Sequence, residues 1–143
     1  MTAEGCPFCA IIAGTQRASV ILDDGAAVAF MDLRQAVPGH VLVVPRRHVP
    51  DIYALAADET ASVMQAAVRV AKALRAEFDP PGLNLWQSNG EAGGQEVFHF
   101  HLHVHPRWPG DGLLRVYPDG LPAISEPARL DALAGSLRTR LDS

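Results

Sequence analysis

The stretch Phe98-His99-Phe100-His101-Leu102-His103-Val104-His105 decides the fold prediction, because apolar residues and histidines alternate along it without a break. A period of two predicts a β-strand with one face on an apolar core and the other in a polar environment. Each imidazole needs hydrogen-bond partners, so the second face cannot pack against a plain apolar layer. Four of the six histidines of the chain lie on this face, which favours a functional site over an ordinary solvent-exposed surface.

Two kinds of chemistry fit these four histidines. Histidines at alternate positions of a strand can bind one catalytic metal ion. Alternatively, a neutral histidine attacks phosphorus while its neighbours hold phosphate oxygens and protonate the leaving group. The preceding segment, residues 88–95, offers side-chain amides and glycine N–H groups that suit an oxyanion, which favours the second chemistry. Glu91 and Glu96 keep the metal alternative open, because they could supply acidic ligands.

The whole chain predicts an α+β fold, in which an antiparallel sheet of about five strands packs with one long helix and a short C-terminal helix. Asp23-Asp24-Gly25 has the composition of a hairpin turn between the first two strands. Besides the histidine strand, strands are expected at residues 20–22, 27–30, 41–45 and 83–86.

Two helices are predicted from caps and periodicity. The long helix is expected to begin at an N-cap, Asp58, and to end near Phe78 before the breaker segment 79–82. Its expected buried stripe is Met64, Ala67, Val68, Ala71, Leu74 and Phe78. Pro127 suits the first turn of the last helix, which carries on one face Leu130, Leu133, Leu137 and Leu141. Residues 106–125 are expected to form a long irregular connection.

Length and composition limit the classes of protein to consider. A chain of 143 residues with 48% hydrophobic residues is long enough for one domain, residues 1–143, with its own core. Its net charge of −4 argues against a nucleic-acid partner bound through a broad basic face. No apolar run reaches the roughly 20 residues that span a bilayer, and the N-terminus lacks the features of a signal peptide. We therefore expect a cytoplasmic protein with no membrane partner.

The triple alternation His99-Phe100-His101-Leu102-His103-Val104 after Gly94-Gln95 resembles the signature of the histidine triad (HIT) family. The resemblance covers a motif-bearing region of about residues 6–108 and leaves 109–143 as a C-terminal extension. It implies a HIT-like fold of the bacterial, zinc-containing type and a homodimer. Further segments that match in order are Phe30-Met31-Asp32, Pro38 to His48, Asn89 and Pro106-Arg107.

The resemblance implies catalytic roles for three histidines. His101 would be the nucleophile that attacks the α-phosphorus of a nucleotide and forms a nucleotidyl-histidine intermediate, which water then resolves. His103 would bind the phosphate and help the leaving group to depart, and His40 would complete the polar cluster. The substrate would be a purine nucleotide, an AMP derivative. It would be bound, besides His101 and His103, by Asp32 at the ribose hydroxyls and by Asn89 and Gln95 at the phosphate or the edge of the site.

Three positions depart from the family pattern. Glu96 stands where several members have Ser or Thr, and a carboxylate there would face away from a phosphate or select a cationic leaving group. His105 replaces an aliphatic residue, and we expect it to be peripheral. Gln35 replaces a common proline, without an expected chemical consequence.

The pair Cys6-Pro7-Phe8-Cys9 supplies half of a zinc site. A redox motif of this type would need a βαβ unit, and no such pattern follows. In a reducing cytoplasm a structural disulfide is not expected either. The resemblance implies that His48 and His99 complete a closed, structural Zn²⁺ site. The alternative is two reduced cysteines packed beneath the N-terminus.

The motif predicts attack on the α-phosphorus and leaves the leaving group open. The protein would be a nucleotide phosphoramidase, a dinucleoside polyphosphate hydrolase or a related nucleotidyl transferase. Two alternatives remain at this point. One is a metal-dependent hydrolase that uses the strand histidines around a catalytic ion, and the other is a nucleotide-binding regulatory module without turnover.

Overall fold

A computed structural model describes residues 3–113 and 115–141. The chain forms two compact units, Met1–Asp111 and Gly112–Ser143. The first unit contains the whole predicted motif-bearing region. The extent of the predicted domain, 1–143, stays a prediction. Its two ends, and position 114 of the predicted irregular connection, lie outside the described residues.

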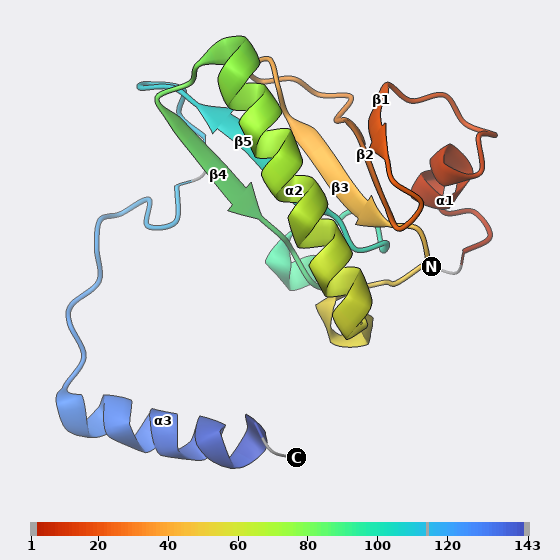
Figure 1. The fold of residues 1–143 in the computed structure, drawn as a ribbon. Coiled ribbons are helices and arrows are strands. Elements are labelled where there is room, and N and C mark those ends of the chain that lie inside the picture. Colours follow the sequence, from red (N-terminus) through yellow and green to blue (C-terminus); the bar gives the residue numbers. More distant parts are fainter. Residues whose placement is uncertain (1–2, 114, 142–143) are drawn as a thin grey trace. The chain divides into compact units, whose positions relative to one another are not determined.

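The first unit is an α+β structure built on an antiparallel sheet of five strands in the order β1-β2-β3-β5-β4 (Figure 1). The predicted fold class is confirmed, and so are the four strands expected outside the histidine segment. Gly25 has a φ of +87° in the predicted turn between β1 and β2, a conformation that suits glycine. The strands are β1 Val20–Asp23, β2 Ala27–Met31, β3 Val41–Pro45, β4 Gly82–Trp86 and β5 Leu102–Arg107.

The two faces of the sheet bury different residues because successive side chains of a strand point in opposite directions. One face packs against helix α2, Ala57–Phe78, which lies along the sheet in Figure 1. This core includes, from the strands, Ala27, Ala29, Val41, Val43, Leu102 and Val104. A second cluster holds the alternate residues Val28, Phe30, Leu42 and Val44 together with Cys6 and Phe8. The histidines of β5 alternate with its core residues and so belong to the second face.

Helix α2 begins two residues before its predicted start. Its N-cap is Ala56, whose N–H donates to Glu59 Oε2 at 2.9 Å, so the expected capping by Asp58 was wrong. The buried stripe also differs from the predicted one. It consists of Val63, Ala66, Ala67, Val70 and Leu74, whereas Met64, Val68 and Phe78 are 48%, 46% and 38% exposed. The two stripes are neighbouring faces of one helix, and the residues on each face recur with helical spacing. Periodicity therefore fits both stripes.

Strand β5 begins at Leu102, so the prediction of a strand from residue 98 was wrong at its start. The ladder with β3 pairs Val43 with Leu102 and ends near Pro45, which has no N–H to continue it. Residues 98–101 run on past the end of β3 with a different contact, from the N–H of Phe100 to Val49 O at 2.6 Å. Two histidines, His99 and His101, therefore precede the strand, and two lie within it.

A short helix that periodicity did not predict, α1 Pro7–Ile12, carries the cysteine pair. Cys6 is its N-cap, and Cys6 Sγ accepts a hydrogen bond from the N–H of Cys9 at 3.4 Å. Phe8 projects from this helix against Phe30 of β2, with ring centroids 5.2 Å apart. Six residues are too few for a periodic signal, which explains why the sequence did not predict this helix. Two 3₁₀ turns, Ile52–Ala54 and Glu91–Gly93, shape the remaining loops.

The second unit contains helix α3, Pro127–Leu141. The predicted last helix is confirmed, with Pro127 at its first position. The leucines at 130, 133, 137 and 141 are between 49% and 80% exposed. Positions 106 and 107 of the predicted irregular connection belong to β5, so its predicted start was wrong. Between β5 and α3, the described residues contain no helix or strand. No helix in the described ranges has the length and apolar character needed to cross a membrane.

Candidate active site and metal centre

One row of paired residues crosses the second face of the sheet. Phe30 of β2 pairs with Leu42 of β3, Leu42 pairs with His103 of β5, and His103 pairs with Trp86 of β4. Facing residues of neighbouring strands lie on the same side of a sheet, so these four side chains form a continuous floor. All four line one cavity. The register of the sheet thus places His103 between the apolar side chain of Leu42 and the indole of Trp86.

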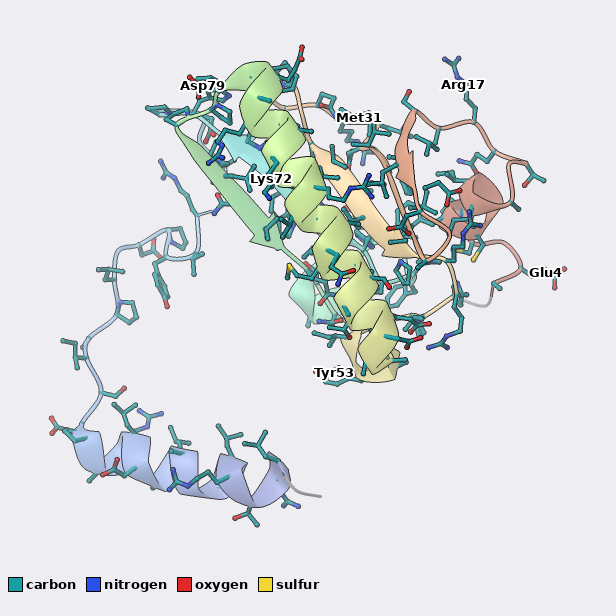
Figure 2. All side chains as sticks on the ribbon, in the orientation of Figure 1. Glu4, Arg17, Met31, Tyr53, Lys72 and Asp79 are labelled. Atoms are coloured by element: carbon teal, nitrogen blue, oxygen red, sulfur yellow. The ribbon has the colours of Figure 1, made fainter. Side chains whose placement is uncertain are left out.

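The cavity above this floor has a volume of about 470 Å³, within the usual range for small-molecule sites. Helix α1 and the segment after it supply one wall, including Phe8, Ile11 and Arg17. Figure 2 shows Arg17 on that segment and another lining residue, Met31, at the end of β2. The loop before β5 supplies a further part of the wall, with Ser88, Gly94, Glu96 and Val97. The site therefore combines apolar surface with both signs of charge.

His101 lines the cavity as a neutral imidazole of defined tautomer. Its Nδ1 lies 2.7 Å from the backbone oxygen of His99. A carbonyl can only accept, so Nδ1 carries the hydrogen and Nε2 keeps its lone pair. Burial lowers the pKa of His101 below its usual value, while the carboxylates of Asp32 and Glu96 act in the opposite direction. The ring thus offers a basic nitrogen at neutral pH.

His103 and His40 form a hydrogen-bonded pair. His40 Nε2 lies 2.8 Å from His103 Nδ1, and His40 Nδ1 lies 3.8 Å from Asp32 Oδ2. Burial, together with the charges of the neighbouring histidines, lowers the pKa of His103 to about 3. Burial also lowers the pKa of His40, against the attraction of Asp32. Asp32, His40 and His103 thus form a connected chain of polar side chains. Its two ends, Asp32 and His103, line the cavity.

Gln35 closes the loop that carries Asp32 and His40. Its amide nitrogen donates to the backbone oxygens of Asp32 and His40, both at 2.8 Å. Its amide oxygen accepts from the N–H groups of Gly39 and His40, at 2.8 and 3.1 Å. No chemical consequence was expected at this position from the sequence. The structure shows a side chain with four hydrogen bonds that fixes the loop between Asp32 and His40.

His105 is buried, on the same face as His103. Its Nδ1 donates to the backbone oxygen of Pro106 at 2.6 Å, and its ring lies 4.5 Å from that of His40 between centroids. It does not line the cavity. The prediction of a peripheral residue agrees with this position behind His40.

The side chains of Asn89 and Gln95 hydrogen-bond to backbone groups in and beside the loop before β5. Asn89 Oδ1 accepts from the N–H of Ile52 at 2.8 Å. The amide nitrogen of Gln95 donates to Pro50 O at 2.6 Å, and its oxygen accepts from the N–H of Gly90 at 2.8 Å. Neither residue lines the cavity, whereas Ser88 does. A phosphate contact by either one stays a prediction.

The second constellation joins the cysteine pair to His48 and His99. Their ligand atoms all lie within 4.8 Å of one another. Cys9 Sγ lies 3.4 Å from His48 Nδ1 and 3.5 Å from His99 Nδ1, and Cys6 Sγ lies 3.5 Å from His99 Nδ1. A tetrahedral zinc ion with bonds of about 2.0–2.3 Å separates its ligands by about 3.3–3.8 Å. These four residues therefore have the spacing and chemistry of a zinc site.

The surroundings also prepare His99 to bind a metal. Its Nε2 donates to the backbone oxygen of Pro45 at 2.9 Å, which leaves Nδ1 free to face the sulfurs. Burial lowers the pKa of His99 to about 4, so the ring is neutral, as a ligand must be. Burial and the neighbouring Cys6 raise the pKa of Cys9 to about 11. A thiolate at Cys9 would thus need a nearby cation.

The four alternating histidines of residues 99–105 do not share one ion. His99 faces the cysteines, and His101 belongs to no ligand group among the described residues. A second possible group is Asp32, His40 and His103. However, the 2.8 Å between its imidazole nitrogens is a hydrogen-bond distance, shorter than the roughly 3.3 Å expected for two nitrogens on a tetrahedral ion. The geometry thus favours a proton-linked pair there.

The model of the HIT domain matches residues 13–110 of this chain. The chain belongs to the HIT family. Protein hit of Bacillus subtilis is 37% identical over 142 residues, which cover 99% of this chain and 97% of that protein. A solved Zn-bound histidine triad family protein from Mycobacterium smegmatis is 30% identical, with a TM-score of 0.72 over 99% of this chain and 98% of its own. A histidine triad nucleotide-binding protein from Candida albicans is 27% identical, with a TM-score of 0.84 over 96% and 97%.

Several residues at this HIT site were not singled out from the sequence. Trp86 and Ser88 line the cavity, but their positions follow from strand register and a loop rather than from a motif. Phe8 was named from the sequence only as part of the segment Cys6-Pro7-Phe8-Cys9. The structure places it edge-on to His99 and His101, with centroids 5.9 and 5.2 Å away. Its position between the two cysteines was the available signal.

Proposed function

We propose that the protein is a HIT-type nucleotidyl hydrolase or transferase that forms a covalent nucleotidyl-histidine intermediate. His101 is the nucleophile. The observation that carries this proposal is the hydrogen bond from Nδ1 of His101 to the backbone of His99, because it leaves the basic Nε2 as the nitrogen available to the cavity. Burial supports the same role, since it keeps the ring neutral.

The reaction has two steps. In the first, His101 Nε2 attacks the α-phosphorus, an N–P bond forms, and the bond from phosphorus to the leaving group breaks. The electron pair stays with the leaving group, which takes up a proton. In the second step a water oxygen attacks phosphorus and the N–P bond breaks, with its electron pair returning to Nε2 of His101. The proton lost by the water passes to the pair of His103 and His40, which thus regains the proton given to the leaving group, and the nucleoside monophosphate departs. Another nucleophile in place of water gives transfer.

His103 and His40 serve the phosphate and the proton. His103 holds the phosphate through Nε2, because its Nδ1 is engaged by His40. The negative charge of the bound phosphate beside the pair favours an added proton, which then becomes available to the leaving group. Asp32 binds the ribose hydroxyls from the end of this line. Asn89 and Gln95 support the phosphate side by fixing the loop that carries Ser88 and Glu96.

A purine nucleotide matches the two parts of the cavity, one lined by apolar side chains and the other by histidines. Phe8, Ile11, Phe30 and Leu42 supply apolar surface for a base, and the histidines supply the phosphate end. The nucleotide-binding protein from Candida albicans supports this ligand class. The substrate is an AMP derivative, either a phosphoramidate with a P–N bond or a dinucleoside polyphosphate with a P–O–P bond.

A structural zinc ion at Cys6, Cys9, His48 and His99 is part of the proposal. The ligand spacing and the Zn-bound relative from Mycobacterium smegmatis support it. Such an ion would attach α1 to the segment before β5. It takes no part in the reaction steps. A reducing cytoplasm, which keeps both thiols available, remains our expected location.

A homodimer is also proposed. Strand β4 lies at the edge of the sheet with Leu83 and Leu85 36% and 42% exposed, and α2 exposes Met64 and Val68. An open edge beside apolar side chains favours pairing with a second copy. Light scattering on the purified protein tests this, and Leu85→Lys should shift a dimer toward the monomer.

The test of the reaction uses an AMP phosphoramidate and a diadenosine polyphosphate as substrates. The wild type should turn over at least one of them, and intact-protein mass spectrometry at alkaline pH should find one nucleotidyl group per chain. His101→Ala and His101→Gln should lose turnover by about 10³-fold or more and lose the adduct. Turnover that survives in folded His101→Ala would exclude the covalent mechanism. Tight AMP binding without turnover would indicate a binding module instead.

A chelator arm separates the metal alternatives. A catalytic ion predicts that mild chelation stops turnover while the fold stays intact and that added zinc restores it. A structural ion predicts instead that loss of metal and loss of thermal stability occur together. Metal content measured on the wild type and on Cys9→Ser identifies the ligands independently of turnover.

A further inference from the structure

Trp86 lies opposite His103 across the ladder of β4 and β5, and the two rings are stacked. Their centroids are 4.4 Å apart and their planes differ by 8°. Such a nearly parallel contact between neighbouring strands covers one whole face of the imidazole. Trp86 also lines the cavity, so its ring lies at the surface that a ligand would meet.

The stacking completes the restraint of His103. Its Nδ1 is held by His40 at 2.8 Å, but one hydrogen bond alone leaves the ring free to tilt about that contact. The indole prevents this tilt from one side. The ring of His101 restrains it further, edge-on with a centroid distance of 4.9 Å. Nε2 is then the one nitrogen of His103 left for the cavity.

We propose that Trp86 is a positioning residue, which holds His103 in place for the phosphate and stabilises the His103 ring in its protonated form. The step that it serves rests on the proposed function, whereas the ring contact does not. The face of an indole attracts a cation, so protonation of His103 strengthens the stacked contact. A leucine would fill similar apolar space without this attraction, and a phenylalanine would keep part of it.

The charges around His103 make this contribution matter. His40 from the start of β3 and His101 and His105 from the same segment all face it, and their charged forms oppose its protonation. The carboxylate of Asp32 contacts the ring of His40, not that of His103. Burial acts in the same direction as the histidines. The indole and a bound phosphate are the groups that favour the imidazolium.

Fluorescence tests the contact directly, because a protonated imidazole stacked on an indole quenches its emission. Trp108→Phe removes the other of the two tryptophans and leaves Trp86 as the sole reporter. Saturating AMP should quench the emission of this variant. The same addition to Trp108→Phe with His103→Gln should leave the emission unchanged. AMP without effect on Trp86 emission, or equal quenching in both variants, would overturn the proposal.

Kinetics test the consequence for the reaction. Trp86→Leu should lower kcat by about tenfold, with KM changed less than about threefold, and Trp86→Phe should fall between it and the wild type. The alkaline limb of the kcat profile should move to lower pH in Trp86→Leu, because a less stable imidazolium at His103 loses its proton at lower pH. Trp108→Phe is the matched control and should keep wild-type values. A Trp86→Leu protein with wild-type kcat and pH profile would contradict a positioning role.

The two arms also separate this inference from the proposed function. A wild type without turnover of any AMP derivative refutes the enzyme, while AMP quenching of Trp86 would still support the stacked, protonated pair. Turnover that requires His101 but not Trp86 refutes the positioning role and leaves the proposed function intact.

Discussion

Nδ1 of His101 donates a 2.7 Å hydrogen bond to the backbone oxygen of His99, and the ring of His99 faces the sulfurs of Cys6 and Cys9. Phe8 contacts the rings of both histidines from its place between the cysteines. The cysteine–histidine cluster and the cavity thus share a backbone segment and an aromatic side chain. A change at one of them should be felt at the other.

Metal removal is therefore expected to weaken nucleotide binding as well as the fold. Cys9→Ser, or the wild type after chelation, should melt at a lower temperature and bind AMP about tenfold more weakly, because α1 and Phe8 lose their attachment. Calorimetry of AMP binding below the melting transition measures this, and added zinc should restore the chelated wild type but not Cys9→Ser. An unchanged Kd in metal-free protein would show that the two sites are independent.

Acidification is expected to destabilise the protein through His103. Burial and the neighbouring histidines together lower the pKa of His103 to about 3, against about 6.5 in an unfolded chain. Between these values the unfolded chain binds a proton that the folded protein does not. The free energy of unfolding should thus fall as the pH drops below about 6.5, by up to about 1.4 kcal/mol per pH unit for this group. Urea denaturation measured from pH 5 to 7 gives the free energy of unfolding at each pH. This free energy should change less steeply with pH in His103→Gln than in the wild type, and an identical pH dependence would contradict the assignment.

Glu96 is expected to select the leaving group. Its carboxylate lines the same cavity as His101 and lies close enough to influence it. A polyphosphate should be repelled there and an amine should not. Glu96→Gln should raise the kcat/KM for a diadenosine polyphosphate, relative to an AMP phosphoramidate, by about five- to tenfold. Glu91→Gln, in the same loop but outside the cavity, is the control, and equal ratios in both variants would argue against selection by charge.

Gly39 is expected to tolerate no side chain. Its φ is +113°, and an added Cβ would lie 2.8 Å from Pro106 Cγ and 3.1 Å from Leu74 Cδ2. Gly39→Ala should therefore lower the free energy of unfolding by about 1–3 kcal/mol more than backbone strain alone. Gly25→Ala provides that comparison, because Gly25 has a similar positive φ and no atoms within 4 Å of an added Cβ. Equal losses in urea denaturation would show that the packing around Gly39 adapts.

The strand alternation was the most informative part of the sequence. It correctly predicted that Leu102 and Val104 face the core and that His103 faces the site. It placed the start of the strand wrongly, because pairing depends on the partner strand, and β3 ends at Pro45. The helix stripe failed for a related reason: periodicity indicates a helix, but only packing decides which of two neighbouring stripes meets the sheet.

Contacts between distant segments explain what the sequence could not predict at the site. The family resemblance predicted the grouping of Cys6, Cys9, His48 and His99, and their ligand atoms do lie together. Trp86 gave no signal, because its meaning comes from its register with His103. The sequence also gave no signal for the role of Gln35, since its four hydrogen bonds depend on the shape of the loop that it closes.

Helix α1 has a practical consequence for anyone preparing this protein. The match to the HIT domain begins at residue 13, one residue after α1 ends. A protein trimmed to residues 13–110 would look complete by family criteria, yet it would lack both cysteines and the aromatic wall at Phe8. Such a fragment should purify without metal and bind nucleotides poorly, and its inactivity would be mistaken for a property of the full chain.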